Sequence, residues 1–143
     1  AQGDSAGLEQ ADYRKVEVHR RKWWPFQPRR IVMAPGGHIW IHSQSPLWCD
    51  DFAKAPIGLQ ALFLHEMTHV WQTQRKGKWY LPLRRHPFCR YSYTFVPGRP
   101  FERYGIEQQA EIVRHTFLQR NSVKPLGAAA LADLERTLPF RNA

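Results

Sequence analysis

The chain has 143 residues, of which 43% are hydrophobic and 13% aromatic, and it carries 21 Lys and Arg against 12 Asp and Glu. Its length predicts a single domain, 1–143, large enough to bury a core, and its hydrophobic content excludes a disordered chain. Two cysteines are too few for a disulfide-rich scaffold, and no apolar run approaches the roughly 18 residues of a membrane span. Residues 1–12 are polar without periodicity and are expected to form a flexible lead-in.

The net charge of +9 lies mainly in two basic blocks, 14–30 and 75–103, in which Arg and Lys are interleaved with aromatic residues. This composition suits single-stranded nucleic acid, but equally an anionic envelope or membrane surface, an acidic partner protein, or a solvated face over buried aromatics. Because no nucleic-acid-binding motif is recognisable, nucleic acid is not the favoured partner.

Short β elements are predicted in the N-terminal third. Residues 15–19 alternate in hydrophobicity, which is typical of a strand. The apolar run 31–34, a Pro-Gly-Gly turn signal and the β-favouring residues 38–42 together predict a hairpin. His38 and His42 are expected at the surface of this hairpin.

Three helices are predicted in the rest of the chain. The first spans 56–76, carries one apolar stripe at helical spacing and ends at Gly77. The others span 106–120 and 125–137, and a strand is expected at 91–96. Few short strands and three helices without βαβ alternation indicate an α+β fold.

The first predicted helix contains His65-Glu66-Met67-Thr68-His69, which fits the H-E-x-x-H pattern. Residues four apart share a helix face, so both imidazoles can bind one metal ion, and Glu66, rotated by about 100°, can act as a base without ligating it. Zinc takes such nitrogen ligands and keeps a fourth position open in catalytic sites. We therefore predict one Zn²⁺ site, against the alternative of two ordinary histidines on an amphipathic helix.

A third protein ligand is expected from the second helix, where Glu107 and Glu111 share a face and the small Ala110 allows close approach to the first helix. One carboxylate can ligate the ion while the other accepts a ring N–H of a ligating histidine. We assign Glu107 as the ligand and Glu111 as its support, with an exchange of roles open; the alternative is an acidic stretch that only favours the helix dipole. His115 is a weaker candidate for the same site.

These motifs carry a family resemblance. The segment 65–72 resembles the H-E-x-x-H-x-x-Q helix of zincin metallopeptidases, and Glu107-x-x-Ala110-Glu111 resembles the E-x-x-A-D/E segment of the gluzincin type. The resemblance implies a zincin-like fold with a small antiparallel sheet or hairpin. It implies that His65, His69 and Glu107 bind one zinc ion and that Glu66 is the general base. The family usually has Asp where this chain has Glu111.

A zincin also needs a strand edge for an extended peptide, for which 38–43 is the candidate. It needs a donor for the tetrahedral oxyanion as well. The sequence does not choose among four candidates, which are Tyr91, Tyr93, Tyr104 and His115.

The whole domain resembles the C-terminal metallopeptidase extension of a type VI secretion spike protein of the VgrG type. This resemblance implies an upstream spike in the same polypeptide and delivery into the periplasm of a competing bacterium. The chain begins Ala-Gln-Gly-Asp, without an initiator Met or a signal pattern, and is expected to be an excised or processed domain.

The expected function is that of a secreted antibacterial toxin, which hydrolyses a peptide or amide bond of a protein or peptide substrate through a zinc-bound water activated by Glu66. The alternative is a basic module that binds nucleic acid or an anionic envelope and has a non-catalytic metal site. Cys49 and Cys89 lack C-x-x-C spacing, so zinc thiolates are not expected; two free thiols and one disulfide both remain open.

Overall fold

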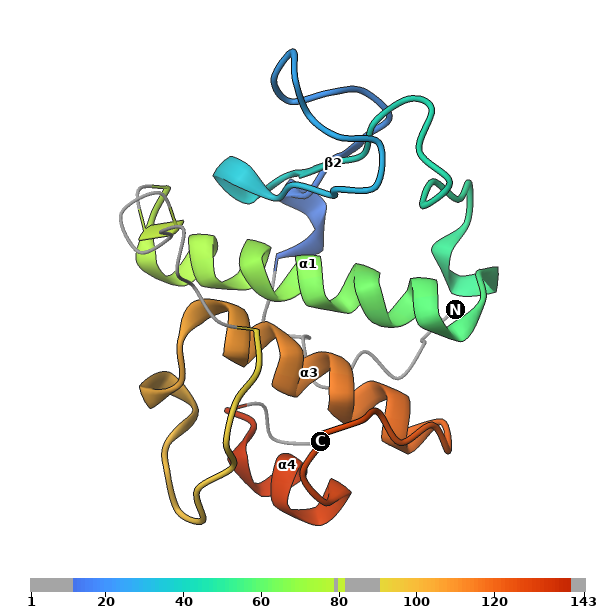
Figure 1. Ribbon diagram of the computed structural model, residues 1–143. Helices are drawn as coiled ribbons and strands as arrows, with labels where there is room; N and C mark the ends of the chain where they lie inside the picture. The colour runs from blue at the N-terminus through green and yellow to red at the C-terminus, as the bar shows by residue number, and fades with distance from the viewer. Residues whose placement is uncertain (1–11, 79, 82–90, 140–143) are drawn as a thin grey trace.

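The computed structural model describes residues 12–78, 80–81 and 91–139 (Figure 1). The lead-in expected at 1–12 falls outside this range except for its last residue. The helices and strands are β1 (Val18–His19), β2 (Ile39–Trp40), α1 (Ile57–Lys76), α3 (Ile106–Arg120) and α4 (Leu131–Thr137). Short 3-10 turns lie at Tyr13–Lys15, Pro35–Gly37, Phe52–Lys54 and Phe101–Arg103. The described residues therefore form an α+β fold, as the sequence predicts.

The first two helices follow their predicted bounds closely. α1 begins after Pro56, whose fixed φ suits a helix start, and ends at Gly77, which adopts a φ of 92° that favours glycine. α3 spans the predicted 106–120. The third prediction, 125–137, is wrong at its start, because Gly127 has a φ of 76° and the chain turns there before α4 begins.

The elements stack in layers, with β2 over one side of α1, α3 against α1, and α4 on the far side of α3 (Figure 1). The apolar core follows this stack, and its fully buried members include Ile39, Met67, Val70, Ile112 and Leu134. Buried polar residues of α1 and α3 face one another between these two helices. This contact between helices holds the candidate site.

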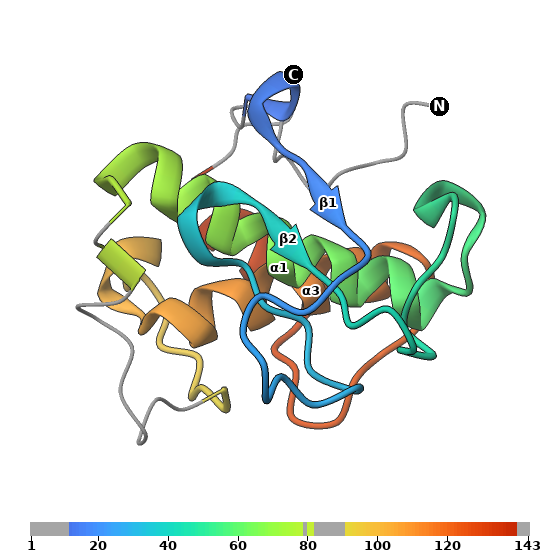
Figure 2. The same cartoon turned by 90° about the horizontal axis from the view of Figure 1, so that it is seen from above.

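The sheet differs from the predicted antiparallel hairpin. β1 and β2 pair in parallel, with Val18 opposite Ile39 and His19 opposite Trp40 (Figure 2). The expected pairing of 31–34 with 38–42 is reduced to one antiparallel bridge between Met33 and Trp40. The difference arises because β1 and β2 are far apart in the chain. Local sequence patterns do not reveal a pairing between such distant segments.

Backbone hydrogen bonds occupy both edges of β2. Ile39 and Ile41 donate their N–H groups to Glu17 and His19, and Trp40 exchanges hydrogen bonds with Met33. The prediction of 38–43 as a free edge for peptide binding is therefore wrong.

The strand expected at 91–96 is absent from the described residues, where this stretch is irregular. It is held by side chains: Gln108 Nε2 donates to Ser92 O, and Val96 N donates to the hydroxyl of Tyr104. These contacts replace the ladder of backbone hydrogen bonds that a strand would need.

Candidate metal centre

Three predicted ligands converge between α1 and α3. Glu107 Oε2 lies 3.2 Å from His65 Nε2 and 3.0 Å from His69 Nε2, and the ligand atoms of all three residues lie within 4.8 Å of one another. The exposed fractions of His65, His69 and Glu107 are 4%, 2% and 1%. A carboxylate is rarely buried to this degree unless it is paired, and here Oε2 of Glu107 pairs with both imidazoles.

This arrangement fits a zinc ion. Two imidazole nitrogens and one carboxylate oxygen are a donor set that catalytic zinc takes, with one position left for water or substrate. Ligand atoms about 2.0–2.1 Å from a tetrahedral ion stand about 3.3 Å apart, close to the separations of 3.0 and 3.2 Å here.

Glu111 supports His65 from the other side of its ring. Its Oε1 lies 2.8 Å from His65 Nδ1, so this nitrogen carries the proton and Nε2 faces Glu107. Without a metal, burial lowers the pKa of His65, but hydrogen bonds to Glu107 and Glu111 outweigh it and raise that pKa to about 9. Glu107 Oε2 thus faces Nε2 of both histidines, whereas Glu111 faces only His65 among the two, and the roles of Glu107 as ligand and Glu111 as support stay predictions.

The carboxylate of Glu111 has further partners on α3. Arg114 Nη1 lies 3.3 Å from Oε1, and His115 Nε2 lies 3.3 Å from Oε2. Burial raises the pKa of Glu111, but its hydrogen bonds to His115 and His65 outweigh burial and hold the pKa far below its usual value. Glu111 is therefore an anion fixed by three neighbours.

Gln72 supports His69, a role that sequence reasoning did not assign. Gln72 Oε1 lies 2.9 Å from His69 Nδ1, and Gln72 Nε2 donates to Ile106 O and to Gln109 Oε1. Gln109 Nε2 in turn donates to Tyr104 O. The spacing His69 to Gln72, one turn of a helix, was the signal that could have revealed this partner.

Glu66, the predicted base, is 6% exposed on α1. It borders an apolar pocket whose other lining residues are Val32, Ile39, Ile41, Leu47, Phe52, Leu59, Leu62 and Phe63. Leu62, one turn before Glu66 on α1, lines the same pocket.

The four candidates for the oxyanion donor lie in different places. Tyr93 donates to, or accepts from, His115 Nδ1 at 2.6 Å, and His115 contacts Glu111, so both residues lie behind His65. The hydroxyl of Tyr104 accepts from Val96 N in a buried position. Tyr91 differs, because its exposed ring stacks on the ring of His65 with centroids 5.9 Å apart.

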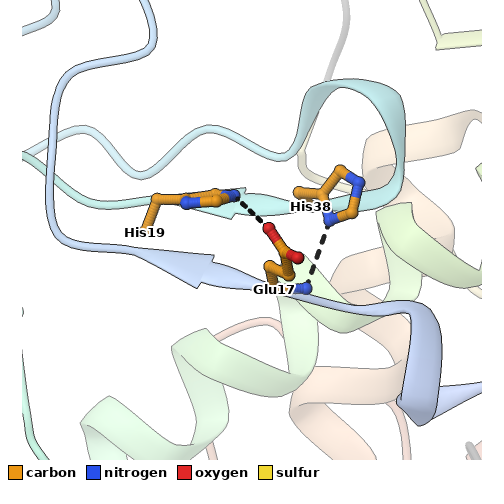
Figure 3. A group of neighbouring side chains, drawn as sticks. All are labelled: Glu17, His19 and His38. Atoms are coloured by element: carbon orange, nitrogen blue, oxygen red, sulfur yellow. Dashed lines mark hydrogen bonds and ion pairs between the residues drawn. The ribbon is translucent and has the colours of Figure 1, made fainter.

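A second group of potential ligands lies at the sheet (Figure 3). Glu17 Oε2 is 3.2 Å from His19 Nε2, but Glu17 N donates to His38 Nδ1 and so uses the lone pair of that nitrogen. The side chain of Glu17 is also largely exposed. This group is a weaker candidate than the buried one. His38 and His42, predicted at the surface, are both partly buried.

Two sequence predictions lie wholly or partly outside the described residues. Cys49 is described and its thiol contacts Asp51 O at 3.2 Å, but Cys89 is not, so the pairing of the two stays open. The second basic block is described only in part for the same reason. In the described residues, no helix is both long and apolar enough to cross a lipid bilayer.

The fold corresponds to that of a known class of bacterial effector domain. The structure superimposes on the effector domain of Pseudomonas aeruginosa VgrG2b with a TM-score of 0.71 and 31% sequence identity, covering 95% of this chain and 78% of that chain. The chain therefore belongs to the family of the VgrG2b effector domain, a type VI secretion effector of the VgrG type.

A curated relative agrees with this assignment. The type VI secretion system spike protein VgrG2b of Pseudomonas aeruginosa is 37% identical over 117 residues, which are 77% of this chain and 11% of that protein. The chain thus spans about a tenth of the length of this relative. No protein-family model matches the chain.

Proposed function

We propose that this domain is a zinc metallopeptidase that hydrolyses a peptide or amide bond, and that it acts as an antibacterial toxin in the periplasm of a target cell. The observation that carries the proposal is the convergence of His65 Nε2, His69 Nε2 and Glu107 Oε2 in a buried position beside Glu66. Membership of the VgrG2b effector-domain family supports the effector role.

Each residue of the site would have a distinct task. When bound, zinc supplies Lewis-acid polarisation of the scissile carbonyl and of the attacking water. Glu66 accepts the proton of that water at its carboxylate and returns it to the leaving amine. Glu111 and Gln72 hold the two imidazoles so that Nε2 of each faces the ion.

Delivery belongs to the same proposal. The relative VgrG2b is a spike protein of the type VI secretion system. We propose that an upstream spike in the same polypeptide carries this domain out of the producing cell. The substrate would then be a protein or peptide reached from the periplasm.

The test compares the wild type with Glu66→Gln, each directed either to the cytoplasm or to the periplasm of a bacterial host. We expect growth arrest only when the wild type is directed to the periplasm. The zinc content of purified Glu66→Gln should equal that of the wild type. Glu17→Gln is the matched control, because Glu17 also contacts a histidine but lies at the exposed sheet. Toxicity that persists in Glu66→Gln would contradict the proposal.

A further inference from the structure

An exposed aromatic loop, residues 20–31, is the strongest feature that the metal centre does not use. Among the described residues, seven large hydrophobic side chains are exposed, and four of them lie in this loop. Their exposed fractions are 50% for Trp23, 44% for Trp24, 79% for Phe26 and 50% for Ile31. Apolar side chains gathered in this way mark an interaction surface, whereas single exposed ones do not.

A buried glutamine holds the aromatic loop in this shape. Gln27 is 3% exposed, and its Nε2 donates to Ile31 O and to Trp40 O of β2. Its Oε1 accepts from Trp23 N at 2.7 Å. Gln27 therefore links the loop near Trp23 and at Ile31 to β2, and it fixes the backbone from which the four exposed apolar side chains extend. The loop projects beyond β2, at the opposite end of the molecule from α4 (Figure 1).

The same loop is strongly basic. It contains five basic residues, which are Arg20, Arg21, Lys22, Arg29 and Arg30, and the stretch 18–49 contains no Asp or Glu. Arg21 lies over the ring of Trp40 and Arg20 over that of Trp48, so the aliphatic parts of these side chains cover apolar rings while their charges stay near the surface. All five basic residues are exposed.

From this loop we infer a membrane-binding surface: the aromatic loop docks this domain on an anionic phospholipid bilayer. Trp and Phe side chains are suited to the bilayer interface, and nearby Lys and Arg attract anionic headgroups. The occupant is a lipid surface and not a nucleic acid, because Trp24 and Phe26 pack edge to face at 71° and do not form parallel platforms for bases. Ile31 has no aromatic ring on which a base could stack, whereas its aliphatic side chain can contact lipid acyl chains.

The experiment uses the whole chain in sedimentation with vesicles of phosphatidylcholine alone or mixed with phosphatidylglycerol. We expect the wild type to bind only the mixed vesicles, and less at high salt. Phe26→Ser should weaken binding by about ten-fold or more, because this side chain would leave the interface. Arg29→Gln with Arg30→Gln should weaken it by about 25-fold, since each basic residue contributes about five-fold near an anionic surface.

Matched controls change similar residues elsewhere. Leu126→Ser removes a fully exposed apolar side chain between α3 and α4, and Lys54→Gln with Lys124→Gln removes two exposed charges. Both controls should bind vesicles as the wild type does. Equal binding by the loop variants and the controls would overturn the proposal. So would a wild type that ignores anionic vesicles but binds a single-stranded oligonucleotide through the same loop. Neither outcome depends on hydrolysis.

Discussion

His69 Nδ1 lies 2.9 Å from Gln72 Oε1, one turn further along α1, and this contact selects the nitrogen of His69 that is left for a metal ion. Exchanging the positions of Oε1 and Nε2 in the amide of Gln72 would lose a hydrogen bond, because Nε2 donates to Ile106 O, a carbonyl that can only accept. Nδ1 must therefore carry a proton. His69 Nε2 then faces Glu107 Oε2 at 3.0 Å, a contact that requires a proton or a cation between them.

Gln72→Met keeps the shape of this side chain but removes its hydrogen bonds. We expect the affinity for zinc to fall by about 10- to 100-fold, because partners of this kind fix the orientation of a ligating histidine. Competition with a chromogenic chelator measures the change. Gln60→Met is the matched control: Gln60 lies in the first turn of α1 and donates to Ala53 O and Ala55 O, far from the ligands. Equal zinc affinities for the two variants would contradict the role of Gln72.

Zinc stoichiometry separates the two groups of potential ligands. The purified protein should bind about one zinc ion per chain, and His65→Ala or Glu107→Ala should reduce this to near zero. His38→Ala should leave the stoichiometry unchanged, because His38 Nδ1 already accepts a backbone hydrogen bond. Elemental analysis after desalting gives these values. Two ions in the wild type and one in His38→Ala would instead assign a metal to the group at the sheet.

The pKa of His65 predicts how the metal-free protein responds to pH. Its pKa is raised from 6.5 to about 9, so the charged ring stabilises the fold below about pH 6.5, and this contribution is lost as the pH rises toward 9. The melting temperature of chelator-treated protein should fall across this interval. Glu111→Gln, which removes one carboxylate partner, should show a smaller fall. A melting temperature that is flat between pH 6.5 and 9 in the wild type would contradict this account.

The helices and their site residues were predictable from the sequence, whereas the sheet was not. Helical spacing puts residues four apart on one face, so His65 and His69, and likewise Glu107 and Glu111, could be paired from their positions alone. The structure brings all four together, although their chemical roles stay predictions.

The β elements depend on contacts that local patterns do not contain. β1 pairs with β2 across the aromatic loop, and residues 91–96 have β-favouring side chains but are held by Gln108 and Tyr104 in an irregular path. Tertiary contacts override propensity in such short segments. Gln72 was missed for a related reason: its spacing from His69 was visible in the sequence, but spacing alone does not show which polar residue of a helix is buried.

Tyr93 should act on stability and not as the oxyanion donor. Its hydroxyl lies 2.6 Å from His115 Nδ1, on the Glu111 side of His65 and away from Nε2. We expect Tyr93→Phe to lower the free energy of unfolding by about 1 kcal/mol, as is usual for one lost hydrogen bond. The rate of hydrolysis should change by less than about ten-fold, where an oxyanion donor would cost about 10²- to 10³-fold. Denaturant unfolding and a rate assay on the same protein distinguish the two roles.

Ala110 is fully buried on α3, three residues after Glu107 and so on the same face, where we expect its small side chain to let α3 lie close to α1. Ala110→Leu should destabilise the fold by about 1–3 kcal/mol through overpacking and should weaken zinc binding, since Glu107 would move away from the histidines. Ala128→Leu, in the partly buried turn before α4, is the control, and it should leave zinc binding unchanged. Denaturant unfolding and chelator competition measure both effects. If Ala110→Leu kept the zinc affinity of the wild type, the helix separation would not be what positions the third ligand.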